Sequence, residues 1–205
     1  MAKFFISAPA IFPSSIVEEG KKINYGVSYP HNKKKEGHKV EVDVYNLLLL
    51  LEADEVFMPP SEVRGNQEYL SFLDTCLKVD ILVKVGETYF TWQVKSNVPK
   101  AKEYLNKYKK VSFNKKAYPA PGVIMLDSYS EGKVGWKYLC LREISRTSGI
   151  PIQPAVLQAV EKWRKLAKAK IKEIPIKVFS VQECTFLTVL GLITFLNSRV
   201  IKLNI

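Results

Sequence analysis

Three side chains that could act together in metal chemistry lie within one short segment of the chain. Asp80, Gln93 and Lys95 stand near the two ends of the segment from Lys78 to Ser96. A carboxylate can bind a hard divalent cation, which prefers oxygen ligands, and the Gln93 amide oxygen or the carbonyl of residue 94 could add a second ligand. An ammonium group can orient a water or stabilise charge that develops on a phosphate. These residue types therefore indicate metal-assisted chemistry on a phosphate, if the chain folds back and brings them together.

The same segment predicts a β-hairpin that would do so. β-branched and aromatic residues fill DILVKV and TYFTWQV, and Gly86-Glu87 between them suits a two-residue type II′ turn. This turn sets a register in which Asp80 lies opposite Gln93, and a slip of one residue would expose the whole apolar set. Because side chains alternate between the two faces of a strand, we expect one face to be core and the other to carry the chemistry. The polar face has Asp80, Leu82, Lys84, Tyr89, Thr91, Gln93 and Lys95, and the core face has Ile81, Val83, Val85, Phe90, Trp92 and Val94.

Asp80, twelve further residues and then Gln93-Val94-Lys95 form a pattern that resembles the PD-(D/E)XK nuclease superfamily. The variant with Gln in the third motif is similar to Mrr-type restriction endonucleases, and the spacing is similar to that of archaeal Holliday junction resolvases. The resemblance implies an α/β fold with a restriction-endonuclease-like αβββαβ core, in which a central mixed sheet is flanked by helices. It also implies a site for Mg²⁺ or Mn²⁺ at Asp80 and Gln93, with Lys95 as a catalytic residue. Because Gln93 is neutral, this site should hold its cation less tightly than a site with a third acid.

A fourth site residue is expected on a helix that precedes the hairpin. The segment from Lys39 to Ala53 contains five consecutive leucines, too long an apolar run for a half-buried strand. In a helix, Glu41 shares a face with apolar residues, so its carboxylate would point inward. In the resolvase and Mrr-like families the first helix supplies an acid to the metal, often four residues after a glycine, and Gly37 and Glu41 have this spacing. We assign Glu41 to the catalytic metal site, with Asp43 as the alternative; the helix dipole alone would also favour an acid there.

The connection from Asp54 to Lys78 is expected to be irregular, with a short helix near Glu68 to Leu73. Long connections in compact domains are often functional. Asp74 is a candidate second acid near the site, although a helix cap or a surface charge is the simpler explanation. Arg64 is a candidate for clamping a phosphate, because its planar guanidinium suits such a contact.

Lysine dominates the chain after the hairpin. The segment from Pro99 to Lys110 predicts a helix with an apolar inner stripe, and Glu103 is its only acid. Exposed lysines neutralise backbone phosphates and give an affinity that falls with salt, whereas a merely solubilising helix usually mixes charge signs. A cationic loop before the first helix is explained equally well as a solvated turn. The lysines assigned to a nucleic-acid surface are Lys33, Lys34, Lys35, Lys100, Lys102, Lys107, Lys109 and Lys110.

The composition agrees with an anionic partner. The chain has 31 basic and 20 acidic residues, a formal net charge of +11, and 47% hydrophobic residues, which is typical of a folded protein. Its three cysteines form no CxxC motif, which argues against a disulfide framework, a zinc site or an iron–sulfur cluster. Pro9 and Pro13 interrupt the apolar N-terminus, which argues against a signal peptide, and the run from Cys184 to Leu196 is too short to cross a bilayer. We therefore expect a soluble cytoplasmic protein.

Three regions are predicted along the chain. Residues 1–35 are an N-terminal extension packed on the core, residues 36–150 are the nuclease-like core, and residues 151–205 are a helical extension. In the core, Ala120 to Asp127 and Trp136 to Arg142 are expected to be strands after the second helix. In the extension, Pro154 to Ile171 predicts a helix. A second, apolar helix from Cys184 to Leu196 would either pack on the core or form a homodimer interface, which would suit cleavage of both strands of a duplex.

The leading hypothesis is a metal-dependent endonuclease that hydrolyses DNA phosphodiester bonds. The alternative is a non-catalytic DNA-binding or assembly protein that retains the nuclease-like fold, and a third reading is a structural protein whose lysines only keep it soluble. The substrate class stays open between duplex, branched and single-stranded DNA, and between DNA and RNA.

Overall fold

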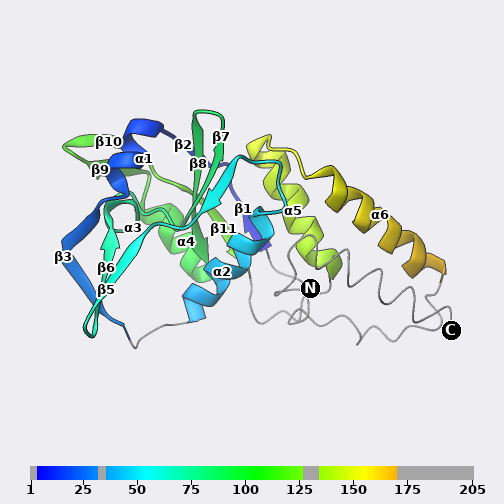
Figure 1. The fold of residues 1–205 in the computed structure, drawn as a ribbon, viewed down its shortest axis with the longest axis horizontal. Helices are drawn as coiled ribbons and strands as arrows, with labels where there is room; N and C mark the ends of the chain where they lie inside the picture. The colour runs from blue at the N-terminus through cyan, green and yellow to red at the C-terminus, as the bar shows by residue number, and fades with distance from the viewer. Residues whose placement is uncertain (1–3, 32–35, 127–133, 170–205) are drawn as a thin grey trace.

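A mixed six-stranded sheet forms the centre of the protein. The computed structural model describes residues 4–31, 36–126 and 134–169 (Figure 1). β8 and β11 are parallel, and the other strand pairs of this sheet are antiparallel. The protein is therefore an α/β protein with a mixed central sheet, as predicted. Its strands lie in the order β1 (Phe4–Ile6), β11 (Gly122–Leu126), β8 (Thr88–Lys95), β7 (Ile81–Val85) and β4 (Glu55–Phe57), and β2 (Ala10–Pro13) pairs with the first half of β8.

The predicted hairpin and its register are confirmed. Ile81 pairs with Trp92 and Val85 with Thr88, so β7 and β8 turn at Gly86 as the pattern indicated. Gly86 has a φ of +57°, which the leading position of a type II′ turn requires. At the same turn, the Asp54 carboxylate accepts a hydrogen bond from the Gly86 N–H, with 2.6 Å between Oδ2 and N.

The second face of the hairpin differs from the expectation. Leu82, Tyr89 and Thr91 are buried, and the two apolar residues belong to a second core cluster. This cluster is completed by β2, by α1 (Ser14–Gly20), by α3 (Phe72–Thr75) and by β9 (Lys110–Phe113). The prediction of one core face and one face for chemistry was therefore wrong, because layers cover the sheet on both sides. Asp80, Gln93 and Lys95 lie together at one end of that face, and Lys84 lies toward the other end, next to the turn.

Helices cover both faces of the sheet. On one face, α2 (Glu36–Leu48), α5 (Val134–Ser148) and α6 (Pro154–Ala169) contribute Val44, Ile144 and Val156 to the largest core cluster. On the other face, α4 (Val98–Lys107) packs Ala101 and Tyr104 against β11. Figure 1 shows α5 and α6 on one side of the molecule and α1 with the β9–β10 hairpin on the opposite side.

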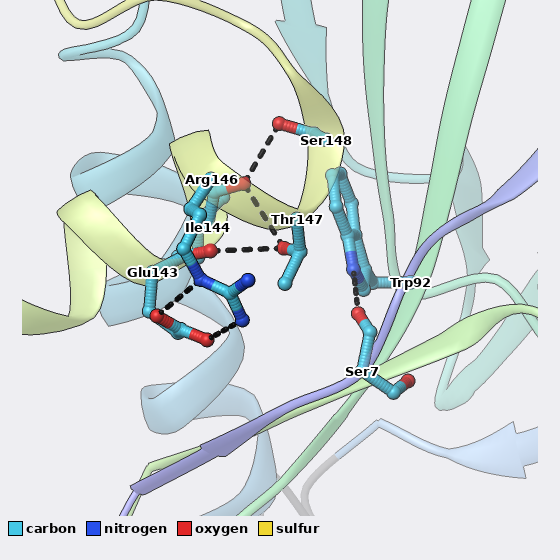
Figure 2. A network of polar contacts seen from close by, with 7 residues as sticks. All are labelled: Ser7, Trp92, Glu143, Ile144, Arg146, Thr147 and Ser148. Atoms are coloured by element: carbon cyan, nitrogen blue, oxygen red, sulfur yellow. Dashed lines mark hydrogen bonds and ion pairs between the residues drawn. The ribbon is translucent and has the colours of Figure 1, made fainter.

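Side-chain hydrogen bonds stabilise the last turn of α5 and join Ser7, which follows β1, to β8 (Figure 2). Thr147 and Ser148 both donate a hydroxyl hydrogen bond to the Ile144 carbonyl one turn earlier. Nearby, the fully buried Trp92 of β8 donates from Nε1 to the Ser7 carbonyl at 3.2 Å. The Trp92 hydrogen bond joins the N-terminal segment to the hairpin, and the two hydroxyl bonds stabilise the last turn of α5.

Two predicted elements were wrong. The segment near Glu68 to Leu73, predicted as a short helix, begins as strand β6 (Gln67–Ser71) because it pairs with β3 (Ile23–Pro30) and β5 (Ser61–Arg64) in a separate three-stranded sheet. The segment from Trp136 to Arg142, predicted as a strand, is part of α5. Cys140, Leu141 and Ile144 are buried there at helical spacing. The predicted strand ended at Arg142, so the helical repeat that Ile144 completes was not recognised. A hairpin of β9 and β10 (Lys116–Pro119) completes the described elements.

Some predictions fall outside the residues that the structure describes. These are the three loop lysines Lys33, Lys34 and Lys35, and the apolar helix from Cys184 to Leu196 with its suggested dimer interface. Within the described ranges, no helix is both long and apolar enough to span a membrane.

Candidate active site

The four residues singled out from the sequence meet at one end of the central sheet. Asp80 directly precedes β7, Gln93 and Lys95 lie in the last part of β8, and Glu41 lies in the first half of α2. The Asp80 N–H donates to the Trp92 carbonyl at 2.9 Å, so the sheet pairing continues up to the acid. The site is thus built on regular secondary structure, which fixes side chains more firmly than a loop would.

Asp80 forms the buried floor of this site. Only 8% of Asp80 is exposed, and its Oδ2 accepts a hydrogen bond from the Val94 N–H at 2.7 Å. Burial raises the pKa of this carboxyl, while the Lys95 ammonium, the Val94 N–H and the Gln93 side-chain amide act in the opposite direction. The Val94 N–H and the Gln93 side-chain amide therefore both stabilise the ionised form of Asp80, which is the form that could bind a cation.

Glu41 is the acid of α2 that interacts with Asp80. Burial, followed by the negative charge of Asp80, raises the pKa of Glu41 to about 7, and Lys95 opposes this rise. The Glu41 carboxylate also lies 3.4 Å from Nδ1 of His38, one turn earlier. Asp43, the alternative candidate, is half-buried on the same helix.

Asp74 is a third acid of the same site. Burial, then the charges of Asp80 and Glu41, raise the pKa of Asp74 to about 7. The Val79 N–H donates to the Leu73 carbonyl at 2.9 Å, which holds α3 against the start of β7 and so places Asp74 beside Asp80. Asp74 was a candidate second acid in the sequence, where a helix cap or a surface charge was the simpler explanation; its interaction with Asp80 and Glu41 favours the first of these.

The Lys95 ammonium lies over the aromatic ring of Tyr104, a residue of α4. Its Nζ lies 5.4 Å from the centroid of the Tyr104 ring, within the range of a cation–π contact. Tyr104 is 4% exposed, and its hydroxyl donates to the Pro121 carbonyl at 3.4 Å. Burial and then the charge of Asp80 raise the pKa of Tyr104, so the ring stays neutral and fixes the path of the lysine.

The donor set fits a hard divalent cation. Glu41 and Asp80 offer carboxylate oxygens and Gln93 an amide oxygen, and Mg²⁺ typically takes one or two carboxylates with waters and substrate phosphates. In the part of the chain that the structure describes, no three His, Cys, Asp or Glu side chains are close enough to hold a metal by themselves. A cation at Asp80 would therefore depend on Gln93, water or a phosphate to complete its shell.

A lysine-rich surface begins directly after the site. The Asn97 side chain accepts the Lys100 N–H at 3.0 Å and so caps α4, which starts three residues beyond Lys95. Arg64, considered as a phosphate clamp, is already held by Glu62 and by the Tyr25 hydroxyl. The predicted lysines of this surface that the structure describes are all exposed: Lys100, Lys102, Lys107, Lys109 and Lys110.

No family model matches this sequence, and no curated protein or solved structure matches it significantly.

Proposed function

We propose that the protein is a metal-dependent endonuclease that hydrolyses DNA phosphodiester bonds. The observation that carries the proposal is the convergence of Glu41, Asp80, Gln93 and Lys95 at one buried end of the sheet. The order α2, β4, β7, β8, α4, β11 also corresponds to the αβββαβ core that the resemblance to PD-(D/E)XK nucleases implies. The smaller β-elements are then insertions into this core.

In the proposed reaction, Glu41 and Asp80 hold Mg²⁺ or Mn²⁺, and the Gln93 amide assists. The cation, when bound, lowers the pKa of a water and polarises a phosphate oxygen. The Lys95 ammonium, directed by Tyr104, stabilises the charge that develops on the phosphate. The lysines of α4 hold the flanking backbone without regard to sequence.

Cleavage of supercoiled, linear and branched DNA with Mg²⁺ or Mn²⁺ tests this proposal. Asp80→Asn should lose at least about a hundredfold in turnover, because it removes the charge but keeps an acceptor for Val94. The matched control is Asp54→Asn, whose carboxylate binds a backbone N–H at the opposite end of the same hairpin. Equal cleavage by wild type and Asp80→Asn would refute the assignment.

Lys95→Ala has its own matched control in Lys84→Ala. Both lysines belong to the β7–β8 hairpin and lie over a tyrosine ring, with Nζ 5.4 Å from Tyr104 for Lys95 and 5.8 Å from Tyr89 for Lys84. We expect Lys95→Ala to lose turnover and Lys84→Ala to keep it, because of these two lysines Lys95 is the one whose charge lowers the pKa of Asp80. Similar losses in both variants would indicate a general effect of hairpin charge.

A non-catalytic DNA-binding protein is the second candidate, and one observation favours it. Asp80 is already stabilised by Val94 and the Gln93 amide, so the site can exist without a metal. This candidate predicts salt-sensitive DNA binding that does not depend on divalent ions. Calorimetric titration of Mn²⁺ into the protein separates the two candidates. Binding heat in the wild type that is absent in Asp80→Asn supports the nuclease, and no binding heat in the wild type supports the non-catalytic protein.

A further inference from the structure

Lys78 has a backbone conformation that its sequence does not favour. Its φ is +57°, in the left-handed region that side chains with a Cβ rarely adopt. Among the described residues other than glycine, only Asn114 and Lys115 share this feature, and they form the turn of the β9–β10 hairpin. A two-residue hairpin turn demands such angles. Lys78 lies in no hairpin turn, so its conformation needs another cause.

The turn after α3 imposes this conformation. The Leu77 N–H donates to the Phe72 carbonyl at 3.0 Å, and the Val79 N–H donates to the Leu73 carbonyl at 2.9 Å. These bonds reverse the chain within a few residues and leave Lys78 at the bend. Glycine would suit this position better on backbone grounds. A lysine held at a strained position beside a reactive site suggests that its ammonium group is needed there.

Lys78 lies two residues before Asp80, beside the candidate active site. Its Nζ donates to the Thr75 carbonyl at 2.7 Å, and Lys78 is half-buried. Its charge lowers the pKa of both Asp74 and Asp80, so it is within electrostatic range of both acids. Yet among the ion pairs of the described residues, Lys78 makes none with either acid. An ammonium has three donors, and one hydrogen bond to a carbonyl leaves capacity for an anion.

The site has three acids, so a further positive charge would help it to bind an anionic substrate. Glu41, Asp74 and Asp80 are acids, and each would repel an approaching phosphodiester when ionised. We propose that Lys78 is a second phosphate-binding ammonium of the active site and contacts a non-bridging oxygen of the bound phosphodiester. The inference rests on the proposed function for its substrate class, but the contact itself requires only that a phosphodiester binds beside Asp80.

Lys78→Gly tests the contact, and Lys115→Gly is a matched control. Each change replaces a lysine of positive φ by the residue that suits this conformation, and each removes one positive charge. Lys115 is exposed at the tip of the β9–β10 hairpin, outside the site. We therefore expect neither variant to lower Tm. The probe is the dinucleoside phosphate TpT with Mn²⁺, titrated by calorimetry, because its single phosphodiester isolates the contact beside Asp80 from contacts along longer DNA.

Lys78→Gly should weaken TpT binding at least about tenfold, whereas Lys115→Gly should leave it unchanged. On long DNA at saturation, Lys78→Gly should also lose at least about tenfold in kcat, and Lys78→Arg should retain most of it. Mn²⁺ alone should bind Lys78→Gly at least as tightly as wild type, because a positive charge near Asp80 is gone.

Equal TpT affinity in Lys78→Gly and Lys115→Gly would overturn the proposal, as would loss of Mn²⁺ binding in Lys78→Gly, which would show a structural role. A different result would refute only the nuclease assignment: no DNA cleavage by wild type, together with TpT binding that Lys78→Gly still weakens. In that case Lys78 remains a phosphate contact of a binding protein.

Discussion

At the scale of single residues, the half-buried carboxyl groups of Glu41 and Asp74 set the pH dependence of stability. Their pKa values rise from 4.5 and 3.8 in the unfolded reference to about 7 in the folded protein. Between these values the folded protein keeps protons that the unfolded chain has released, so the free energy of unfolding should fall as the pH rises from about 4 to above 7. Urea unfolding at pH 5 and pH 8 should show this fall, and Glu41→Gln should reduce it. If the free energy of unfolding of Glu41→Gln depended on pH as strongly as that of the wild type, the raised pKa of Glu41 would be contradicted.

Gln93 is the residue that limits metal affinity in the proposed site. Gln93→Glu adds a negative charge beside Asp80, so Mn²⁺ should bind about tenfold more tightly at pH 8, equivalent to about 1.4 kcal/mol. The protein without metal should become less stable, because another carboxylate is buried among like charges. Calorimetric titration measures the affinity, and Gln67→Glu, at an exposed position of β6, is the control. Equal affinity in all three proteins would place the cation away from Gln93.

At the scale of elements, the N-terminal segment and β11 approach each other closely at Gly122. A Cβ on Gly122 would overlap the Ala8 carbonyl oxygen, and β11 pairs with both β1 and β8 around this point. We expect Gly122→Ala to cost about 1–3 kcal/mol of stability, measured by urea unfolding. Gly37→Ala is the control, because its Cβ would be 4.0 Å from Glu41 Oε1 and alanine favours a helix by about 0.5–1 kcal/mol. Wild-type stability in Gly122→Ala would mean that the segment moves freely.

At the scale of the whole molecule, the net charge of +11 predicts DNA binding that weakens with salt. If α4 makes the phosphate contacts, changing Lys100, Lys102 and Lys107 to glutamine should lower the slope of log K against log salt by up to about 3. Fluorescence anisotropy at several salt concentrations measures this slope. A triple variant of Lys22, Arg142 and Lys162 removes the same charge from other exposed elements. Equal slopes in both triple variants would assign the salt dependence to overall charge.

The sequence by itself determined the local part of the site. The two-residue turn at Gly86 set the register that places Asp80 opposite Gln93. Helical periodicity likewise selected Glu41 as an inward acid. These features depend on residues only a few positions apart, so their periodicity is visible in the chain.

Only the tertiary structure decided what surrounds these residues. Asp74 reaches Asp80 because α3 is hydrogen-bonded to the start of β7, and Lys95 is directed by Tyr104 because α4 packs on β11. The strand state of β6 likewise depends on pairing with β3, far away in the chain. The second buried face of the sheet arises in the same way, from elements on both sides of the hairpin in sequence. Such contacts join distant segments, and periodicity shows which residues are buried but does not reveal their partners.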